Sequence, residues 1–176
     1  MINNKIIINL LITLLFLGCT QEKWLTHLNV QESYEITYSE SWELFQKANA
    51  LGFVSPKEGE KDGFQENVNI IVQDLSQQPM TLEEYTELSK QQLSAELGDN
   101  SITSLEKISF SEERAMEIIY DVPKDPKSGI NIDLKYRQVW FIKNNKAYLF
   151  TYTAEKDQYE NYSEVAMKTI ESFKWK

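Results

Sequence analysis

The sequence predicts an α+β protein, an α/β/α sandwich in which helices flank a central, largely antiparallel β-sheet. Two stretches of the chain have helical apolar spacing and helix-start signals, and one long hairpin is apolar on both faces. A strand pair that is apolar on both faces needs a covering layer on each side. Two amphipathic helices, one on each face, can supply those layers.

The first strands are expected ahead of the helices. Residues 34–38 alternate polar and apolar side chains, and residues 67–75 are apolar at Val68, Ile70 and Val72. This spacing of two is typical of strands with one buried face. Between these strands, residues 56–63 combine Pro, Gly and charged side chains, which predicts a surface loop.

The first helix is expected to begin at Thr81 and to end before Gly98. Thr81 and Glu84 have the spacing of a capping box, in which each side chain bonds the other residue's backbone N–H. Met80 and Tyr85 hold the positions of a hydrophobic staple, and a Gly commonly follows the last helical turn. One apolar stripe runs along this helix: Leu82, Tyr85, Leu88, Leu93 and Leu97.

A hairpin is the best-marked strand pair. After expected strands at 102–110 and 115–122 and a loop at 123–129, residues 130–143 and 146–154 flank the dipeptide Asn144-Asn145. Asn tolerates the left-handed backbone that a two-residue hairpin turn requires. This turn predicts a register with the pairs Trp140–Leu149 on one face and Phe141–Tyr148 on the other.

The second helix is expected to open at Asp157, with Glu160 at the reciprocal capping position. Apolar residues then recur at helical spacing to the end of the chain: Tyr159, Tyr162, Ala166, Ile170 and Phe173.

The amino terminus resembles the signal of a bacterial lipoprotein. After Lys5, an apolar run from residue 6 to residue 17 leads into Gly18 and the only cysteine, Cys19. This run is too short to span a bilayer but has the length of a signal-peptide core. The cysteine stands where lipoprotein processing acylates the sulfur and cuts just before it, although Phe16 departs from the leucine usual three residues before it. The alternative is an ordinary secretory signal with a coincidental cysteine.

Three segments follow from this interpretation: a signal peptide at 1–18, a lipidated tether at 19–30 and one folded domain at 31–176. Two or more acyl chains hold a protein stably on a membrane. The expected location is therefore the bacterial cell envelope, by lipid anchor. Thr20 is not an Asp, which favours the periplasmic face of the outer membrane over the inner membrane.

The charge and the rare residue types exclude several functions. A formal net charge of −9 disfavours nucleic acid and electrostatic adhesion to anionic lipid. The acidity serves either solubility or a basic partner. His27, the only histidine, falls in the expected tether, and no free thiol remains once Cys19 is acylated. We therefore expect no catalytic residue, no metal site, no cofactor and no enzyme activity.

Four residues remain as candidates for contact with a protein partner. Trp42 follows a strand in a turn flanked by Ser and Glu, which makes it the tryptophan least clearly buried. Glu58, Glu60 and Asp62 alternate in the Gly-containing loop. Their spacing could supply oxygen ligands to calcium but lacks the EF-hand length and its closing Glu. The alternative for the acids is a solvated loop, and for Trp42 a place in the core.

The order and spacing of these segments, over about residues 30–175, resemble the PsbP-like family. Its fold is shared with the nuclear-transport factor Mog and the bacterial protein DcrB. Residues 111–114 (Ser-Glu-Glu-Arg) depart from the family, which often has Gly in this turn. The likeness is carried by residues 38–42 (Tyr-Ser-Glu-Ser-Trp), 67–72 (Asn-Val-Asn-Ile-Ile-Val), 81–85 (Thr-Leu-Glu-Glu-Tyr), 148–154 (Tyr-Leu-Phe-Thr-Tyr-Thr-Ala) and 170–173 (Ile-Glu-Ser-Phe).

The resemblance implies a binding or scaffolding domain without a shared active site. We therefore expect a membrane-anchored envelope lipoprotein that acts as a non-enzymatic protein-binding adaptor. A narrower version neutralises or chaperones a basic secreted effector. Two alternatives remain open: a small-ligand or lipid carrier with a pocket between sheet and helix, and a hydrolase that uses two carboxylates.

Overall fold

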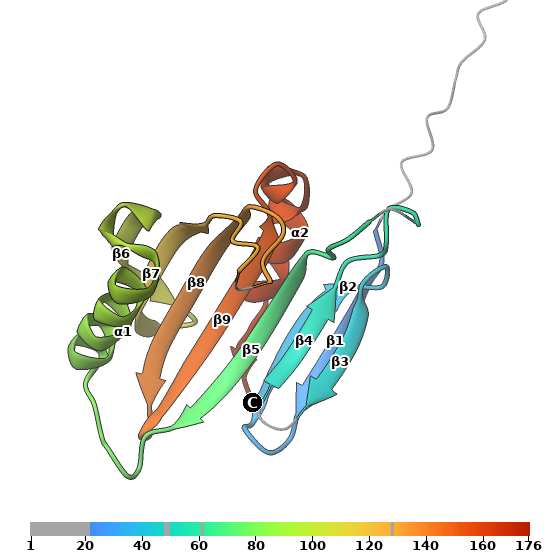
Figure 1. Ribbon diagram of the computed structural model, residues 1–176. Coiled ribbons are helices and arrows are strands. Elements are labelled where there is room, and N and C mark those ends of the chain that lie inside the picture. The colour runs from blue at the N-terminus through green and yellow to red at the C-terminus, as the bar shows by residue number, and fades with distance from the viewer. Residues whose placement is uncertain (1–21, 48–49, 61, 128) are drawn as a thin grey trace, which may run out of the picture.

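Seven antiparallel strands form the main sheet of the protein. The computed structural model describes residues 22–47, 50–60, 62–127 and 129–176. From one edge to the other (Figure 1), the strands are β3 (Glu43–Lys47), β4 (Ala50–Val54), β5 (Asn67–Asp74), β9 (Lys146–Glu155), β8 (Leu134–Lys143), β7 (Glu113–Val122) and β6 (Ile102–Phe110). The sequence prediction of a largely antiparallel sheet is confirmed.

A second, three-stranded sheet comprises β1 (Trp24–Asn29), β2 (Tyr34–Ser39) and β10 (Lys174–Trp175), with β2 in the centre. The prediction that residues 19–30 are all tether is therefore wrong for β1. All six residues of β1 pair with β2, from Trp24 opposite Ser39 to Asn29 opposite Tyr34. Cys19 and the predicted signal peptide lie outside the described residues.

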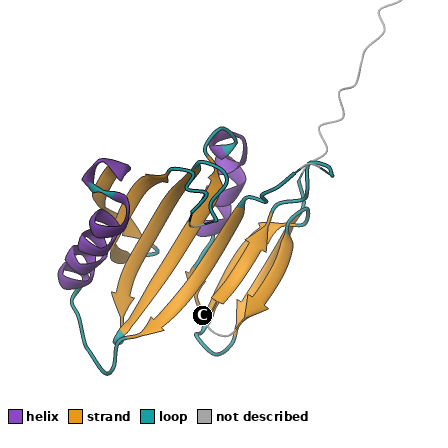
Figure 2. Ribbon diagram, in the orientation of Figure 1, coloured by secondary structure: helices purple, strands orange, loops and turns teal. Residues whose placement is uncertain are grey.

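Helices α1 (Leu82–Leu97) and α2 (Tyr159–Glu171) cover opposite faces of the main sheet (Figure 2). On one face, Tyr85 of α1 packs with Met116, Ile118 and Trp140. On the other face, α2 and the small sheet share a core with β4, β5, β8 and β9. The predicted sandwich, with one helix on each face, is confirmed. No helix in the described part of the chain is long and apolar enough to cross a bilayer.

Local signals account for α1 and for the long hairpin. The Thr81 hydroxyl accepts the Glu84 N–H at 3.2 Å, and the Glu84 carboxylate accepts the Thr81 N–H at 2.8 Å. Asn144 and Asn145 have φ of 52° and 56°, and they place Trp140 opposite Leu149 as predicted. Leu88 is the exception in the predicted apolar stripe, because 39% of it is exposed.

The second helix differs from its prediction at both ends. It begins at Tyr159 after Gln158, which makes no side-chain capping bond, so the predicted start at Asp157 is wrong. It ends at Glu171, and Phe173 lies beyond it. The chain then forms β10, which pairs with β2.

A glycine in β4 makes room for an aromatic ring. Gly52 lies opposite Phe45 of β3, and the Phe45 ζ carbon is 2.0 Å from the point where a Cβ on Gly52 would stand. We expect Gly52→Ala to displace this ring and lower the free energy of unfolding by about 1 kcal/mol. The cost is modest because the ring is partly exposed and free to swing outward.

A double-mutant cycle measured by urea denaturation checks this expectation. In a Phe45→Ala background, Gly52→Ala should cost markedly less, because no ring has to move. Equal costs in the two backgrounds would contradict the contact.

Candidate functional site

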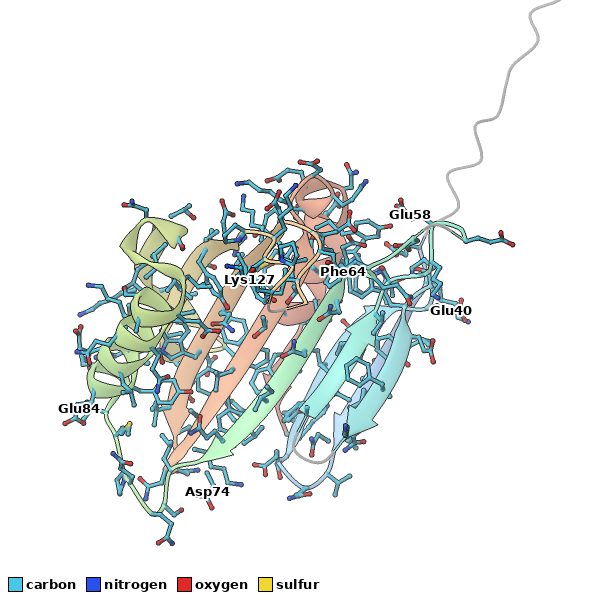
Figure 3. The ribbon with its side chains drawn as sticks, viewed as in Figure 1. Glu40, Glu58, Phe64, Asp74, Glu84 and Lys127 are labelled. Carbon is cyan, nitrogen blue, oxygen red and sulfur yellow. The ribbon has the colours of Figure 1, made fainter. Side chains whose placement is uncertain are left out.

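An acidic cavity of about 460 Å³ lies where the loop at 55–66 meets the end of β9 and the start of α2. Five carboxylates line it, from Glu58, Glu60, Asp62, Glu66 and Glu155. Figure 3 shows Glu58 and Phe64 of this loop at one end of the molecule. The three acidic residues predicted from the sequence are thus brought together in one cavity.

The loop is closed at its base and shaped by its own side chains. The Ser55 N–H donates to the Glu66 carbonyl at 2.8 Å, where the chain leaves β4 and enters β5. The Asp62 carboxylate accepts the N–H groups of Glu58 at 2.9 Å and of Phe64 at 3.1 Å. Asp62 therefore holds the loop, whereas Glu58 and Glu60 are exposed to solvent.

Helix α2 contacts the acidic loop through Tyr162. The Tyr162 hydroxyl donates to the Glu58 carboxylate. Burial raises the pKa of this phenol, and the hydrogen bond and charge of Glu58 raise it further. Tyr162 therefore stays protonated at neutral pH and remains a donor to Glu58.

Trp42 does not offer the exposed surface that we expected. Only 5% of it is exposed, and it belongs to the core beneath α2. Its ring makes an edge contact with Tyr162 at 6.3 Å between centroids. The prediction of a partner contact at Trp42 is wrong, because the side chain supports Tyr162 from within the fold.

Glu66 is a buried carboxylate at the cavity. It is 3% exposed, and the Ser55 hydroxyl donates to it at 3.3 Å. Burial raises the pKa of Glu66, and the nearby negative charge of Glu155 raises it further. A buried carboxylate normally has a cationic partner, because desolvation of an unpaired charge is costly.

None of the five cavity carboxylates has such a partner among the residues that the structure describes. Eight ion pairs occur elsewhere in this part of the chain, for example Glu32 with Lys146 at 2.7 Å and Glu117 with Arg137 at 2.8 Å. Within the described residues, acids at eight other positions are thus paired with a base, whereas the five cavity carboxylates form no ion pair.

The other candidate chemistry lies apart from the cavity. His27 is in β1, opposite Ile36, and burial lowers its pKa. Within the described ranges, no group of three or more His, Cys, Asp or Glu residues is arranged to hold a metal ion. The alternative that Glu58, Glu60 and Asp62 bind calcium is therefore not supported by a metal-binding group among the described residues.

Two residues of the cavity, Glu66 and Glu155, were not predicted from the sequence. Glu66 directly precedes β5 and Glu155 is the last residue of β9, and in this strand pair Asn67 lies opposite Thr153. This register brings residue 66 close to residue 155. The signal could be found only by predicting which strands are neighbours, because the two residues are far apart in the sequence.

The state of Glu66 gives a pH prediction. A carboxyl group with a pKa raised by folding stabilises the protein below its unfolded pKa, and this contribution is lost as the pH rises through the folded pKa. We expect Glu66→Gln to raise the free energy of unfolding by about 0.5–1 kcal/mol at pH 7. At pH 4, where the wild-type carboxyl group is already protonated, the increase should be smaller.

Urea denaturation at both pH values checks this prediction, with Glu60→Gln as the control on the exposed part of the same loop. A loss of stability in Glu66→Gln at pH 7, or an equal gain in both variants, would contradict it.

The space between the main sheet and α2 is filled by aromatic rings. Phe110, Phe141, Phe150 and Phe173 lie there with every pair of ring centroids 4.9–6.0 Å apart. The carrier alternative placed its ligand between sheet and helix, and these rings occupy that space on the α2 side.

No family model and no curated protein matches this chain. Among solved structures, the cyanobacterial PsbP (CyanoP) of Synechocystis sp. PCC 6803 is 15% identical, with a TM-score of 0.61 over 90% of this chain and 96% of that one. LpqN of Mycobacterium tuberculosis, involved in cell envelope biogenesis, is 10% identical, with a TM-score of 0.56 over 88% and 91%.

The Ran-binding protein Mog1p of Saccharomyces cerevisiae is 9% identical, with a TM-score of 0.52 over 86% of this chain and 95% of that one. At these identities the likeness shows the fold alone. The chain has the PsbP/Mog-like fold, which confirms the fold that the sequence resemblance implied.

Proposed function

We propose that this chain is a non-enzymatic binding protein of the bacterial envelope, and that its acidic cavity holds a basic segment of another protein. The observation that carries the proposal is the set of five carboxylates around one cavity, none of which forms an ion pair within the described residues. Lysine or arginine side chains would supply the missing positive charge.

The anchoring part of this proposal comes from the amino-terminal sequence. Acylation at Cys19 would hold the domain on a membrane, with the periplasmic face of the outer membrane favoured by Thr20. The involvement of LpqN in cell envelope biogenesis and the binding of Ran by Mog1p support envelope and protein-binding roles for this fold.

The charge of the cavity lining favours a protein segment over a lipid. Its volume is within the range of binding sites, but carboxylates dominate its lining, whereas apolar ligands need apolar walls. A net charge of −9 adds a long-range attraction for basic partners, which would include a basic secreted effector.

Binding of a fluorescent, unstructured Lys/Arg-rich peptide to the mature chain in detergent tests the proposal. A triple variant, Glu58→Gln with Glu60→Gln and Glu155→Gln, should bind the peptide at least tenfold more weakly. A control with the same change in net charge places Glu→Gln at the exposed positions Glu43, Glu87 and Glu106, outside the cavity. It should change the affinity less than twofold.

Equal weakening in both triple variants would show that only net charge matters, which would overturn the cavity as the site. Affinity capture of the natively processed protein from its own envelope extends the test. A stoichiometric protein that the wild type retains and the cavity variant loses is the expected result. Bound lipid without protein would favour the carrier alternative.

A further inference from the structure

The chain between the expected lipid and the folded domain is short. The Lys23 carbonyl accepts the Glu40 N–H at 2.8 Å, and β1 begins at Trp24. Four residue steps separate Cys19 from Lys23, which is at most about 14 Å when fully extended. Had residues 19–30 all been tether, as predicted, the reach would have been about 40 Å.

The acidic cavity lies at the same end of the molecule as Lys23. Lys23 bonds Glu40, two residues before Trp42; the Trp42 ring contacts Tyr162, and Tyr162 bonds Glu58. Figure 3 shows Glu40 and Glu58 at one end and Asp74 at the other. Strand β5 runs from the cavity end toward Asp74 over about 25 Å.

We infer that the acylated protein holds this acidic end against the bilayer, and that the basic segment it binds belongs to a membrane-embedded protein. This inference rests on the proposed function and on acylation of Cys19. The segment would lie at the level of the lipid headgroups, directly beside a membrane-spanning element of the partner.

The narrow space between the bilayer surface and the tethered domain is the reason for this choice of partner. A folded domain of 100 residues has a radius of gyration of about 13 Å and does not fit between the membrane and a domain tethered within about 14 Å of it. A helix about 10–12 Å wide or an extended segment does fit. Tethering on the same surface also raises the effective concentration of such a segment to the millimolar range.

Fluorescence quenching measures the orientation. The natively acylated protein carries a fluorophore at Glu40→Cys or at Asp74→Cys and is placed in phosphatidylcholine vesicles that contain a headgroup-quencher lipid. Acylated Cys19 offers no thiol, so only the new cysteine is labelled. We expect several-fold stronger quenching at position 40 than at position 74, and equal quenching would overturn the inference.

A longer tether tests the partner. An insertion of about 20 Gly/Ser residues after Thr20 adds about 25 Å of average reach. It should weaken binding to a transmembrane peptide with four flanking lysines in the same vesicles at least tenfold. Binding of the same lysine-rich sequence free in solution should stay unchanged.

The two proposals fail in different ways. Unchanged binding of the transmembrane peptide after the insertion would overturn the membrane-facing inference and leave the proposed function standing. Mass spectrometry that finds no acyl group on Cys19 would overturn this inference and the anchoring part of the proposed function, and would leave the binding of a basic segment standing. Failure to bind the soluble lysine-rich peptide with or without the insertion would overturn the proposed function itself.

Discussion

Replacing Phe173 with alanine is expected to lower the free energy of unfolding by about 3–5 kcal/mol. Phe173 is 2% exposed and lies between α2 and β10. Its ring is 5.0 Å from each of the Tyr34, Phe150 and Trp175 rings, measured between centroids. It therefore joins the small sheet to the core of the main sheet, and alanine would leave a cavity that these rigid rings cannot close.

Urea denaturation of the mature chain measures this loss, and a fall in melting temperature of at least about 6 °C should accompany it. Phe45→Ala is the matched control, because it removes the same side chain from a position that is 41% exposed. The control should cost about 1 kcal/mol. A loss at Phe173 no larger than the loss at Phe45 would mean that Phe173 does not join the two sheets.

Replacing Cys19 with alanine is expected to abolish membrane association of the exported domain almost completely. Two or more acyl chains make anchoring effectively stable, whereas an acidic domain without them has no attraction for anionic lipid. The variant is exported behind an ordinary cleavable signal peptide, so that failed processing of the native signal does not retain it. Fractionation should place the native protein with membranes and the variant with the soluble fraction.

Mass spectrometry of the native protein supplies the control for this prediction. A mature chain that begins at Cys19 and carries acyl mass is expected. Phe16→Leu, which restores the usual residue, should be processed at least as well. Membrane association of the Cys19→Ala variant equal to that of the native protein would contradict the lipid anchor.

The features that the sequence predicted well depend on contacts between near neighbours in the chain. The capping box of α1 joins Thr81 to Glu84, and the hairpin turn needs only the tolerance of Asn144 and Asn145 for positive φ. Once that turn is known, the register of β8 and β9 follows by counting. Both features are therefore local, and the residue types indicate them directly.

The start of α2 shows how distant contacts override a local signal. Asp157 and Glu160 have capping spacing, but the Lys156 N–H donates to the Asp133 carbonyl at 2.9 Å. The Lys156 ammonium also pairs with Asp121 at 2.7 Å. These bonds hold the turn after β9, and the helix begins only at Tyr159.

Long-range pairing also decided which residues form the site. The Gly-containing loop with Glu58, Glu60 and Asp62 can be predicted from the sequence. Glu66 and Glu155 come close to it only because β5 pairs with β9. Trp42 was misjudged for the same reason, since its burial depends on Tyr162 of a helix far along the chain.

The amino-acid sequence was therefore enough for the sandwich class, the helix α1, the main hairpin and the acidic loop. Only the tertiary structure revealed the small sheet with β1 and β10, the burial of Trp42, and the five carboxylates around one cavity. Propensity, capping and turn chemistry act over a few residues, whereas short edge strands and shared cavities form only when distant segments pack together.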